Sequence, residues 1–186
     1  MLVQIGDIRV AHIRFRLVEE GDAEFIYSLR SHPIKSRYLS PVSGDVDEQR
    51  TWIRNYKLRE QAGDEFYFLI EDPAAGRVGV VRIYDFQGNS FSWGSWLLKE
   101  GAPVYVAIES ALAVYELGFY SLGMKRSHFE VRKGNARVAK FHERFGAIRV
   151  SEDCLNYYYE ISCGTYERAK LRYGKYFKEG LKSARK

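Results

Sequence analysis

The sequence predicts a mixed α+β domain built around a largely antiparallel sheet, and three observations support this. Segments with the alternating pattern of strands are interleaved with segments of helical periodicity. Three consecutive strands are separated only by short turns, which produces an antiparallel meander. One long apolar helix lies between two strands, as in a βαβ crossover. The 186 residues are enough for one domain with its own core.

The first elements can be placed in order from the N-terminus. Residues 9–18 alternate apolar and polar side chains as a strand does, and the short helix that follows should end at Pro33. Asp45 with Glu48 three residues later has the spacing of a capping box. A second helix should therefore begin there and end at Gly63.

The remaining elements follow more regularly. They are strands over 65–71, 77–86 and 90–98, a helix over 104–119, a strand over 126–132, a helix over 135–145, and strands over 147–150 and 155–162. The crossover places a helix N-terminus, residues 102–104, at the end of the third of these strands. Unpaired backbone N–H groups and the helix dipole make such an end suitable for a phosphate.

The net charge of +5 is concentrated at the C-terminus. Residues 164–186 hold eight Lys or Arg and two Glu, so the rest of the chain is close to neutral. A basic tail on a neutral body is not typical of a surface that reads nucleic acid. The tail places Tyr166, Ala169, Tyr173 and Phe177 on one helical stripe. We therefore expect a helix that packs on the body or on a second subunit of a homodimer.

The two cysteines, Cys154 and Cys163, form no CxxC motif, and no histidine stands at zinc-ligand spacing. We therefore expect neither a metal site nor a redox centre. The first residues lack the basic segment and apolar run of a signal peptide. No run approaches the ~20 apolar residues of a membrane span. The expected location is cytoplasmic.

Two motifs resemble a known family. The segments WLLKEGAPV, before the central helix, and GNARVAKFHERFGA, after the next strand, resemble the GNAT superfamily of acyl-CoA-dependent N-acetyltransferases. The resemblance covers about residues 12–163 and implies one acyltransferase domain over 1–163, with 164–186 as a basic C-terminal helix and tail. It also implies a sheet whose fourth and fifth strands splay apart, with acetyl-CoA as co-substrate and no metal.

The resemblance assigns a binding strip for the cofactor. In the family the pantetheine arm of CoA adds itself beside a bulged fourth strand, which here implies backbone contacts from Trp96, Leu97 and Leu98. Leu98 also stands where a backbone N–H would stabilise the thioester oxygen, a catalytic role.

The phosphate loop of the family reads Arg/Gln-x-x-Gly-x-Gly/Ala. The corresponding residues here are Lys99, Gly101, Ala102, Pro103 and Val104. Only Gly101 and Ala102 match the pattern, while Lys99 could supply a positive charge and Pro103 suits the first helical turn. A plain Gly-Pro turn before a helix would look the same.

The second motif begins at Asn135 and places Val138, Phe141, His142 and Gly146 at family positions. The family Asn contacts the pantetheine arm, although Asn135 could be only a helix N-cap. His142 stands where a tyrosine commonly protonates the departing CoA thiolate. Imidazole, with an ordinary pKa near 6.5, could donate that proton. The alternative is a half-buried histidine with no part in the chemistry.

A base for the acceptor amine is harder to assign. Many relatives place Glu on the fourth strand, and the matching residue here is Ser92, which cannot act as a base. Glu130 on the next strand and Glu109 in the central helix are substitutes, although solvated carboxylates are the usual explanation for such residues. Glu130 is our candidate. Neither cysteine falls on a position that the family uses for chemistry.

Arginines and aromatic rings gather in the segments that bind the acceptor in this family, the first two helices and nearby strand ends. They are Arg30, His32, Arg37, Tyr38, Trp52, Arg82 and Tyr84. Such residues suit an anionic acceptor with a planar ring, although some could be solvated surface charges. RSHPIKSRYLS and FSWGSWLL most resemble the branch that acetylates amino sugars on nucleotide carriers, for surface polysaccharide or flagellar glycan synthesis.

Two other functions stay open. Acetyltransferases of ribosomal-protein N-termini are close to that branch, so protein N-terminal acetylation is an alternative. A CoA-binding sensor or scaffold without catalysis is another; the missing strand-four carboxylate favours it and His142 counts against it. The expected partner is a small-molecule amine, with no nucleic acid.

Overall fold

The computed structural model describes residues 5, 8–33, 38 and 44–176. Within them, eight strands form one sheet in the order β1-β2-β3-β4-β5-β6-β8-β7. The elements are β1 (Ile8–Arg9), β2 (Arg14–Leu17), α1 (Ala23–Arg30), α2 (Val46–Ala62), β3 (Phe66–Asp72), β4 (Gly76–Gln87), β5 (Ser90–Leu98), α3 (Val104–Glu116), β6 (Arg126–Arg132), α4 (Ala136–Arg144), β7 (Ile148–Glu152), β8 (Asn156–Ser162) and α5 (Cys163–Lys170). All neighbouring strands are antiparallel except β5 and β6. The predicted mixed α+β class with one crossover is confirmed.

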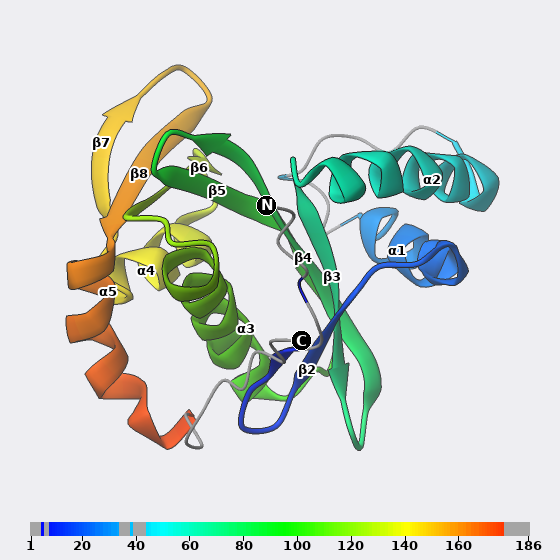
Figure 1. Cartoon of the computed structure of the whole chain (residues 1–186), viewed down its shortest axis with the longest axis horizontal. Helices are drawn as coiled ribbons and strands as arrows, with labels where there is room; N and C mark the ends of the chain where they lie inside the picture. The colour runs from blue at the N-terminus through cyan, green and yellow to red at the C-terminus, as the bar shows by residue number, and fades with distance from the viewer. Residues whose placement is uncertain (1–4, 6–7, 34–37, 39–43, 177–186) are drawn as a thin grey trace.

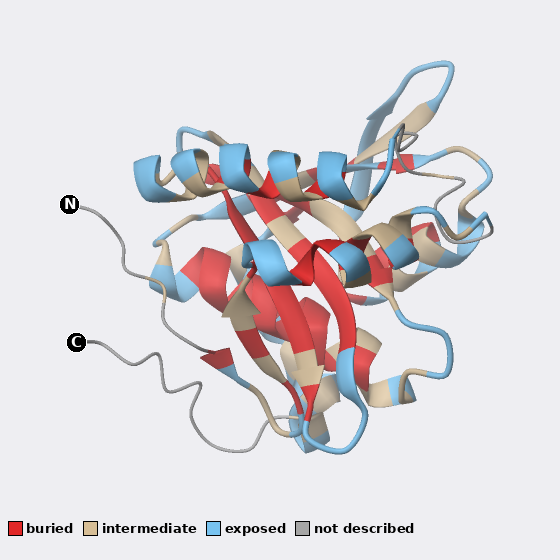
Figure 2. Ribbon diagram, turned by 90° about the vertical axis from the view of Figure 1, so that its right-hand side faces the viewer, coloured by how far each residue is buried: buried red, intermediate tan, exposed pale blue. Residues whose placement is uncertain are grey.

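Helices cover both faces of the sheet (Figure 1). One face, called here the α3 face, carries α3, α4 and α5, and the other, the α2 face, carries α1 and α2. Each has its own core: Val81 and Ile83 of β4 belong to the first and Val80 to the second. Because side chains alternate along a strand, Arg82 and Tyr84 point to the α2 face. Figure 2 shows the buried strand residues lying behind the helices.

The start of the sheet differs from the expected single strand over 9–18, which is wrong. The chain instead turns between β1 and β2, where the N–H of Val10 donates to the carbonyl of Ile13 at 2.9 Å. The cause is the fully buried carboxylate of Glu109 on α3. It accepts hydrogen bonds from the N–H groups of His12 at 2.9 Å and Ile13 at 3.3 Å. Alternation along a segment cannot reveal such a distant partner.

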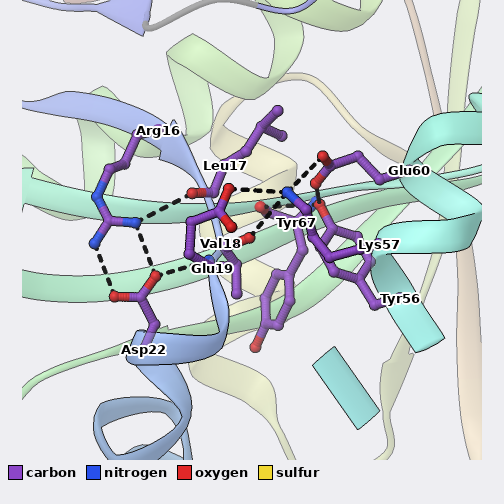
Figure 3. Close-up of polar contacts among 9 residues, drawn as sticks. All are labelled: Arg16, Leu17, Val18, Glu19, Asp22, Tyr56, Lys57, Glu60 and Tyr67. Atoms are coloured by element: carbon purple, nitrogen blue, oxygen red, sulfur yellow. Dashed lines mark hydrogen bonds and ion pairs between the residues drawn. The ribbon is translucent and has the colours of Figure 1, made fainter. Parts of the chain in front are cut away.

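Polar contacts fasten α1 and α2 to the sheet (Figure 3). Arg16 on β2 donates to both carboxylate oxygens of the buried Asp22, at 2.7 and 2.8 Å. Lys57 of α2 donates to the carbonyl of Val18 at 3.4 Å and to Glu19 at 3.0 Å, just after β2. The buried hydroxyl of Tyr56 donates to Glu60 and accepts from a backbone N–H of β3 at 2.7 Å. These contacts hold the helices of the α2 face against the sheet, next to the predicted acceptor residues Arg82 and Tyr84.

Two of the three predicted helix ends are confirmed. The carboxylate of Asp45 accepts from backbone N–H groups of the first turn of α2, including that of Glu48 at 3.0 Å. Gly63 ends α2 in the left-handed conformation, with φ 81°. The first helix ends at Arg30, before Pro33, because Ser31 already closes its last turn.

The C-terminal segment packs on the body as far as the structure describes it. Tyr166 and Ala169 of α5 are buried, and the Tyr166 hydroxyl donates to Glu116 of α3 at 2.7 Å. The ring of Tyr173 stacks on Phe145 at 4.7 Å. Phe177, the last residue of the predicted stripe, lies outside the described residues. No helix of the described part has the length and apolar character to cross a membrane.

Candidate active site

The sheet opens between β5 and β6. These strands pair in parallel only where Ser90 lies opposite Arg126 and Phe91 opposite Ser127. Beyond these two pairs they diverge, so the splayed pair implied by the sequence resemblance is confirmed. The opening lies beside the C-terminal half of β5, where the cofactor residues were predicted.

A bulge shapes the β5 side of this opening. Val80 of β4 lies opposite Leu97 and Arg82 opposite Gly94, so two residues of β5 face one of β4. One of the two is Ser95, whose backbone has φ 47°. The extra residue re-aims the strand after it, which is the usual effect of a β-bulge.

The backbone N–H of Leu98 points toward the opening. Leu98 lies opposite Gly79, and the next residue, Lys99, donates its N–H to the carbonyl of Val78 at 2.7 Å. Because N–H groups alternate between the two sides of a strand, that of Leu98 is directed away from β4. This is the direction that its predicted role at the thioester oxygen requires.

The predicted phosphate loop leads to an open helix end. Pro103 is the N-cap of α3, no side chain caps the helix, and its first turn contains no acidic residue. The N–H of Ala102 donates to the carbonyl of Lys99 at 3.2 Å, which closes the turn. Gly101, at φ 74°, has open space where a side chain would be, and Val104 is 83% exposed. The helix N-terminus is therefore accessible to an anion.

His142 lies between the diverging strands on the α3 face. Its ring centroid is 4.2 Å from that of Phe129 on β6 and 5.0 Å from that of Trp93 on β5. The side chain is buried, and its Nδ1 has no hydrogen-bond partner among the described residues. Burial lowers the pKa of His142 to about 3. The imidazole is therefore neutral at physiological pH, with one N–H available to donate.

The other residues predicted to bind the cofactor include Trp96 on β5, Asn135 just before α4 and Phe141 within α4. The indole N–H of Trp96 donates to the hydroxyl of Ser110 on α3 at 3.1 Å, and its ring centroid lies 5.0 Å from that of Phe141 on α4. Asn135 occupies the N-cap position of α4, but its side chain makes no capping hydrogen bond. The N-cap alternative therefore does not account for the Asn135 amide.

On the α2 face the structure brings three of the predicted acceptor residues together. The guanidinium of Arg82 lies 4.4 Å from the ring centroid of Tyr84 and 5.8 Å from that of Trp52 on α2. Its Nε is 3.2 Å from a carboxylate oxygen of the buried Glu65. This ion pair holds the guanidinium over the rings.

Arg30 joins the same cluster through Tyr67. Burial raises the pKa of the Tyr67 phenol to about 12, and the guanidinium groups of Arg30 and Arg82 oppose that rise. Two guanidinium groups therefore lie near one buried hydroxyl, and that of Arg82 is already paired with Glu65.

Two described residues between α1 and α2 contact the segments on the far side of the opening. The hydroxyl of Tyr38 donates to the carbonyl of Gly134, just before α4, at 3.0 Å. His32 lies 3.8 Å from a carboxylate oxygen of Glu100 in the phosphate loop. Arg37 lies outside the described residues. The predicted acceptor residues His32 and Tyr38 thus lie next to the predicted cofactor motifs.

The carboxylates considered as bases have different surroundings. Besides two backbone N–H groups, Glu109 contacts the Nδ1 of His12 at 2.5 Å, so its position in the core is structural. Glu130 is exposed on β6 and points to the α2 face, because its neighbour Phe129 belongs to the core of the α3 face. Ser92, between two core residues of β5, also points to the α2 face.

A group of three side chains next to this position was not predicted. The ring of His128 on β6 contacts the hydroxyl of Ser90 on β5 at 2.7 Å through Nδ1, and Asp85 on β4 at 3.1 Å through Nε2. The sequence places His128 two residues before Glu130, and hence on the same face of the strand. It does not reveal which residues of β4 and β5 lie beside it.

Side chains that could ligate a metal, and a cavity that could hold a ligand, are two further features to consider. In the described part of the chain, no three His, Cys, Asp or Glu side chains converge as metal ligands. A cavity of about 630 Å³ lies between the β1–β2 turn and the β3–β4 turn, and none of the predicted site residues lines it.

An open helix N-terminus beside a splayed, bulged strand pair is the architecture of an acyl-CoA-binding transferase. The chain belongs to the GNAT acetyltransferases, since the family model described as an acetyltransferase (GNAT) domain matches residues 12–148. Members of this family are N-acetyltransferases that use acetyl-CoA. A search of curated proteins found no match.

Solved structures resemble the chain at two levels. Apo FdhC, described as a nucleotide-linked sugar GNAT, is 46% identical, with 92% of this chain and 98% of that chain covered and a TM-score of 0.85. Spermidine N-acetyltransferase from Vibrio cholerae, in complex with CoA and spermine, is 17% identical, with coverage of 84% and 99% and a TM-score of 0.71. A GCN5-related N-acetyltransferase from Brucella melitensis is 14% identical, with coverage of 100% and 93% and a TM-score of 0.77. The last two matches show the fold alone.

Proposed function

We propose that the protein transfers the acetyl group of acetyl-CoA directly to the primary amine of an amino sugar carried on a nucleotide. The observation that carries the proposal is the cluster of Arg82, Tyr84 and Trp52 on the acceptor face of the splayed sheet. An arginine with neighbouring rings can bind a phosphate and stack on a base. The 46% identity to a nucleotide-linked sugar GNAT over nearly the whole chain supports the same acceptor class.

The donor side of the site has a separate set of residues. The backbone of Trp96, Leu97 and Leu98 would hold the pantetheine arm, and the α3 N-terminus with Lys99 would hold the pyrophosphate. Asn135 and Phe141 would contact the arm from α4. The cofactor supplies the activated acetyl group when bound, and these residues orient it toward the α2 face.

Most of the rate enhancement would come from positioning, because both reactants are held in one site. The N–H of Leu98 would stabilise negative charge on the carbonyl oxygen. His142 would donate its N–H to the sulfur as the C–S bond breaks. Since its pKa is about 3, the ring would act as a neutral hydrogen-bond donor and not as an imidazolium.

The test is turnover of acetyl-CoA, followed as free thiol, with matched acceptors. The panel contains nucleotide-linked amino sugars, the same sugars without the nucleotide, a polyamine and peptides with ribosomal-protein N-termini. We expect kcat/KM for a nucleotide-linked sugar to exceed that of the free sugar by ~100-fold or more, because the nucleotide provides binding energy at a distance from the amine.

The same panel separates the alternatives. Preference for a peptide would contradict the sugar proposal and support N-terminal acetylation. Binding of acetyl-CoA without turnover of any acceptor would support the non-catalytic sensor.

A further inference from the structure

Transfer to an amine requires a proton acceptor. An alkylammonium has no lone pair until it loses a proton, and the β5 position used by many relatives is Ser92 in this chain. The group that replaces the missing carboxylate should lie on the α2 face, near the point where β5 and β6 diverge.

His128 lies at that point. The last parallel pair joins Phe91 to Ser127, so the next residues along each strand, Ser92 and His128, are neighbours where the strands begin to separate. Phe91 and Phe129 point to the α3 face, so Ser92 and His128 point to the α2 face. The imidazole thus stands beside the position of the missing carboxylate.

The two neighbours of His128 determine its tautomer. Hydrogen bonds from Gln87 and His128 lower the pKa of Asp85, which is therefore ionised at neutral pH. A carboxylate can only accept, so the proton of the neutral ring resides on Nε2. Nδ1 then carries the lone pair and accepts from the hydroxyl of Ser90 at 2.7 Å.

The backbone of Asp85 supports this arrangement. Asp85 has φ 51°. Among the non-glycine residues that the structure describes, Asp85 and Ser95 of the bulge are the two with a positive φ. Such a conformation costs about 1 kcal/mol or more and persists where the surroundings enforce it. Here it lies at an irregularity between β4 and β5, from which the carboxylate reaches across β5 to the ring.

We propose that His128, oriented by Asp85, is the general base of the acetyl transfer, and that the Ser90 hydroxyl passes the proton of the acceptor amine to its Nδ1. His128 and Ser90 are the catalytic residues of this step, and Asp85 is a positioning residue. The inference rests on the proposed function, since it requires an amine acceptor on the α2 face.

The step balances. The ammonium gives one proton through Ser90 to His128, which becomes imidazolium beside the Asp85 carboxylate and later releases the proton to water. The nitrogen lone pair forms the C–N bond to the acetyl carbon, and the C–S bond breaks. The second proton of the nitrogen ends on the CoA thiolate as a thiol, so one proton is released in each turnover.

Glu130 is the rival base on the same strand. It is exposed, and no hydrogen bond or ion pair orients its side chain in the described structure. His128 is held by two partners, and its side chain is 25% exposed, so it is both positioned and accessible. Orientation by a third group is the usual feature of a catalytic base.

The experiment measures kcat/KM of the full chain, with the best acceptor of the panel, for His128→Gln, Ser90→Ala, Ser90→Thr and Asp85→Asn. We expect a ~100-fold or larger loss for H128Q. S90A should lose ~10-fold or more and S90T should recover activity, because the hydroxyl is the relay. Acetyl-CoA affinity, measured by calorimetry, should stay within ~2-fold in all variants, which excludes unfolding as the cause.

The pH profile distinguishes a catalytic base from a residue with only a structural role, because a purely structural loss would not change the pH dependence of the activity. Without the base, only amine that is already neutral in solution can react, so the ratio of wild-type to H128Q activity should fall as pH rises from 7 to 9. D85N should change the acid limb of the profile, and Asp85→Glu should restore it.

Three carboxylates of the described residues face the region around the His128 ring. Besides Asp85 on β4, they are Glu130 on its own strand and Glu160, its antiparallel partner on β8, which pairs with Arg126 at 3.8 Å. Glu160→Gln is therefore the matched control: it removes a neighbouring carboxylate without removing the orienting one, and it should leave kcat/KM within ~2-fold.

H128Q activity equal to wild type, or a large loss confined to Glu130→Gln, would overturn the base assignment. Full activity of S90A would overturn the relay. If the wild-type protein prefers an amine other than a nucleotide-linked sugar, the ratios are measured with that amine. Failure of the acceptor proposal and failure of the base assignment are therefore distinguishable.

Discussion

The imidazole of His142 lies among aromatic rings that cannot solvate its charged form. Burial lowers its pKa to about 3, below the ordinary value of 6.5. Between these two pH values the unfolded chain binds a proton that the folded protein does not. The free energy of unfolding therefore falls as pH is lowered through this window.

The His142→Leu variant isolates this dependence. From pH 7 to pH 5 we expect the wild-type protein to lose about 2 kcal/mol more stability than the variant, because only wild type exposes a titrating ring at position 142 on unfolding. Urea unfolding at both pH values measures the difference. Equal losses would show that solvent reaches the folded ring.

In the proposed acceptor cluster, the planar guanidinium of Arg82 lies 4.4 Å from the Tyr84 ring centroid. Arg82→Lys keeps the charge but loses the stacking and the forked donors. We expect KM for the nucleotide-linked sugar to rise ~10-fold, with little change for the free sugar.

Arg149→Lys is the matched control for Arg82. Arg149 lies 4.6 Å from the Tyr157 ring centroid, in the same kind of stack, but on β7, an edge strand of the sheet. Its KM values should match those of wild type. An equal rise in both variants would indicate a general loss of stability and would contradict the acceptor role of Arg82.

Among the elements, β4 and β5 leave no room for a side chain at Gly79. A Cβ at this position would lie 2.6 Å from the carbonyl oxygen of Leu97 and 3.3 Å from the Cα of Leu98. Backbone atoms cannot move aside as the end of a flexible side chain can. The glycine thus fixes the distance of the cofactor strip from its neighbouring strand.

Gly79→Ala should therefore affect both stability and cofactor binding. We expect a loss of about 1–3 kcal/mol from overpacking and weaker acetyl-CoA binding, because Leu97 and Leu98 are displaced. Urea unfolding and calorimetry measure the two effects. Gly21→Ala, where a Cβ meets nothing within 4 Å, is the control. Unchanged affinity in G79A would contradict the placement of the arm along this strip.

Element types were predictable because most strands and helices carry strong local patterns. Asp45 and Gly63 also marked their helix ends correctly, since capping is a local interaction. The error at 9–18 arose where the partner was distant: the N–H groups of His12 and Ile13 bond to Glu109. The alternation of apolar and polar residues predicts which face of the sheet a side chain lies on, but not which group its backbone N–H bonds to.

The candidate site was predictable in part for the same reason. Motifs that are contiguous in sequence, such as the loop after Leu98, could be located from the sequence. The contact of His128 with Asp85 and Ser90 depends on the register of three strands, which no single segment encodes. The neutral state of His142 also depends on burial by rings from separate elements.

At the scale of the whole molecule, the sheet consists of two parts joined at β5 and β6. Among the described residues, two parallel residue pairs, those of Ser90 and Phe91, join β5 to β6 in the sheet. A ligand that lies along the rest of the opening would add contacts between the two parts. Because those contacts are absent from the unfolded chain, binding should stabilise the fold.

Acetyl-CoA should therefore raise Tm as its concentration increases. At a concentration 100 times Kd, the expected gain in the free energy of unfolding is about 2.7 kcal/mol. Thermal unfolding across a titration measures it, with adenosine alone as the control ligand. A Tm that does not respond to acetyl-CoA would contradict cofactor binding to the folded protein.

The bond between the β1–β2 turn and α3 also has a consequence for biosynthesis. His12 and Glu109 are 97 residues apart, so the ribosome adds Glu109 on the order of 5 to 20 s after His12. During that interval the first strands lack the carboxylate that holds their turn. The N-terminal edge of a nascent chain is thus exposed to proteases and chaperones until translation has passed the middle of the protein.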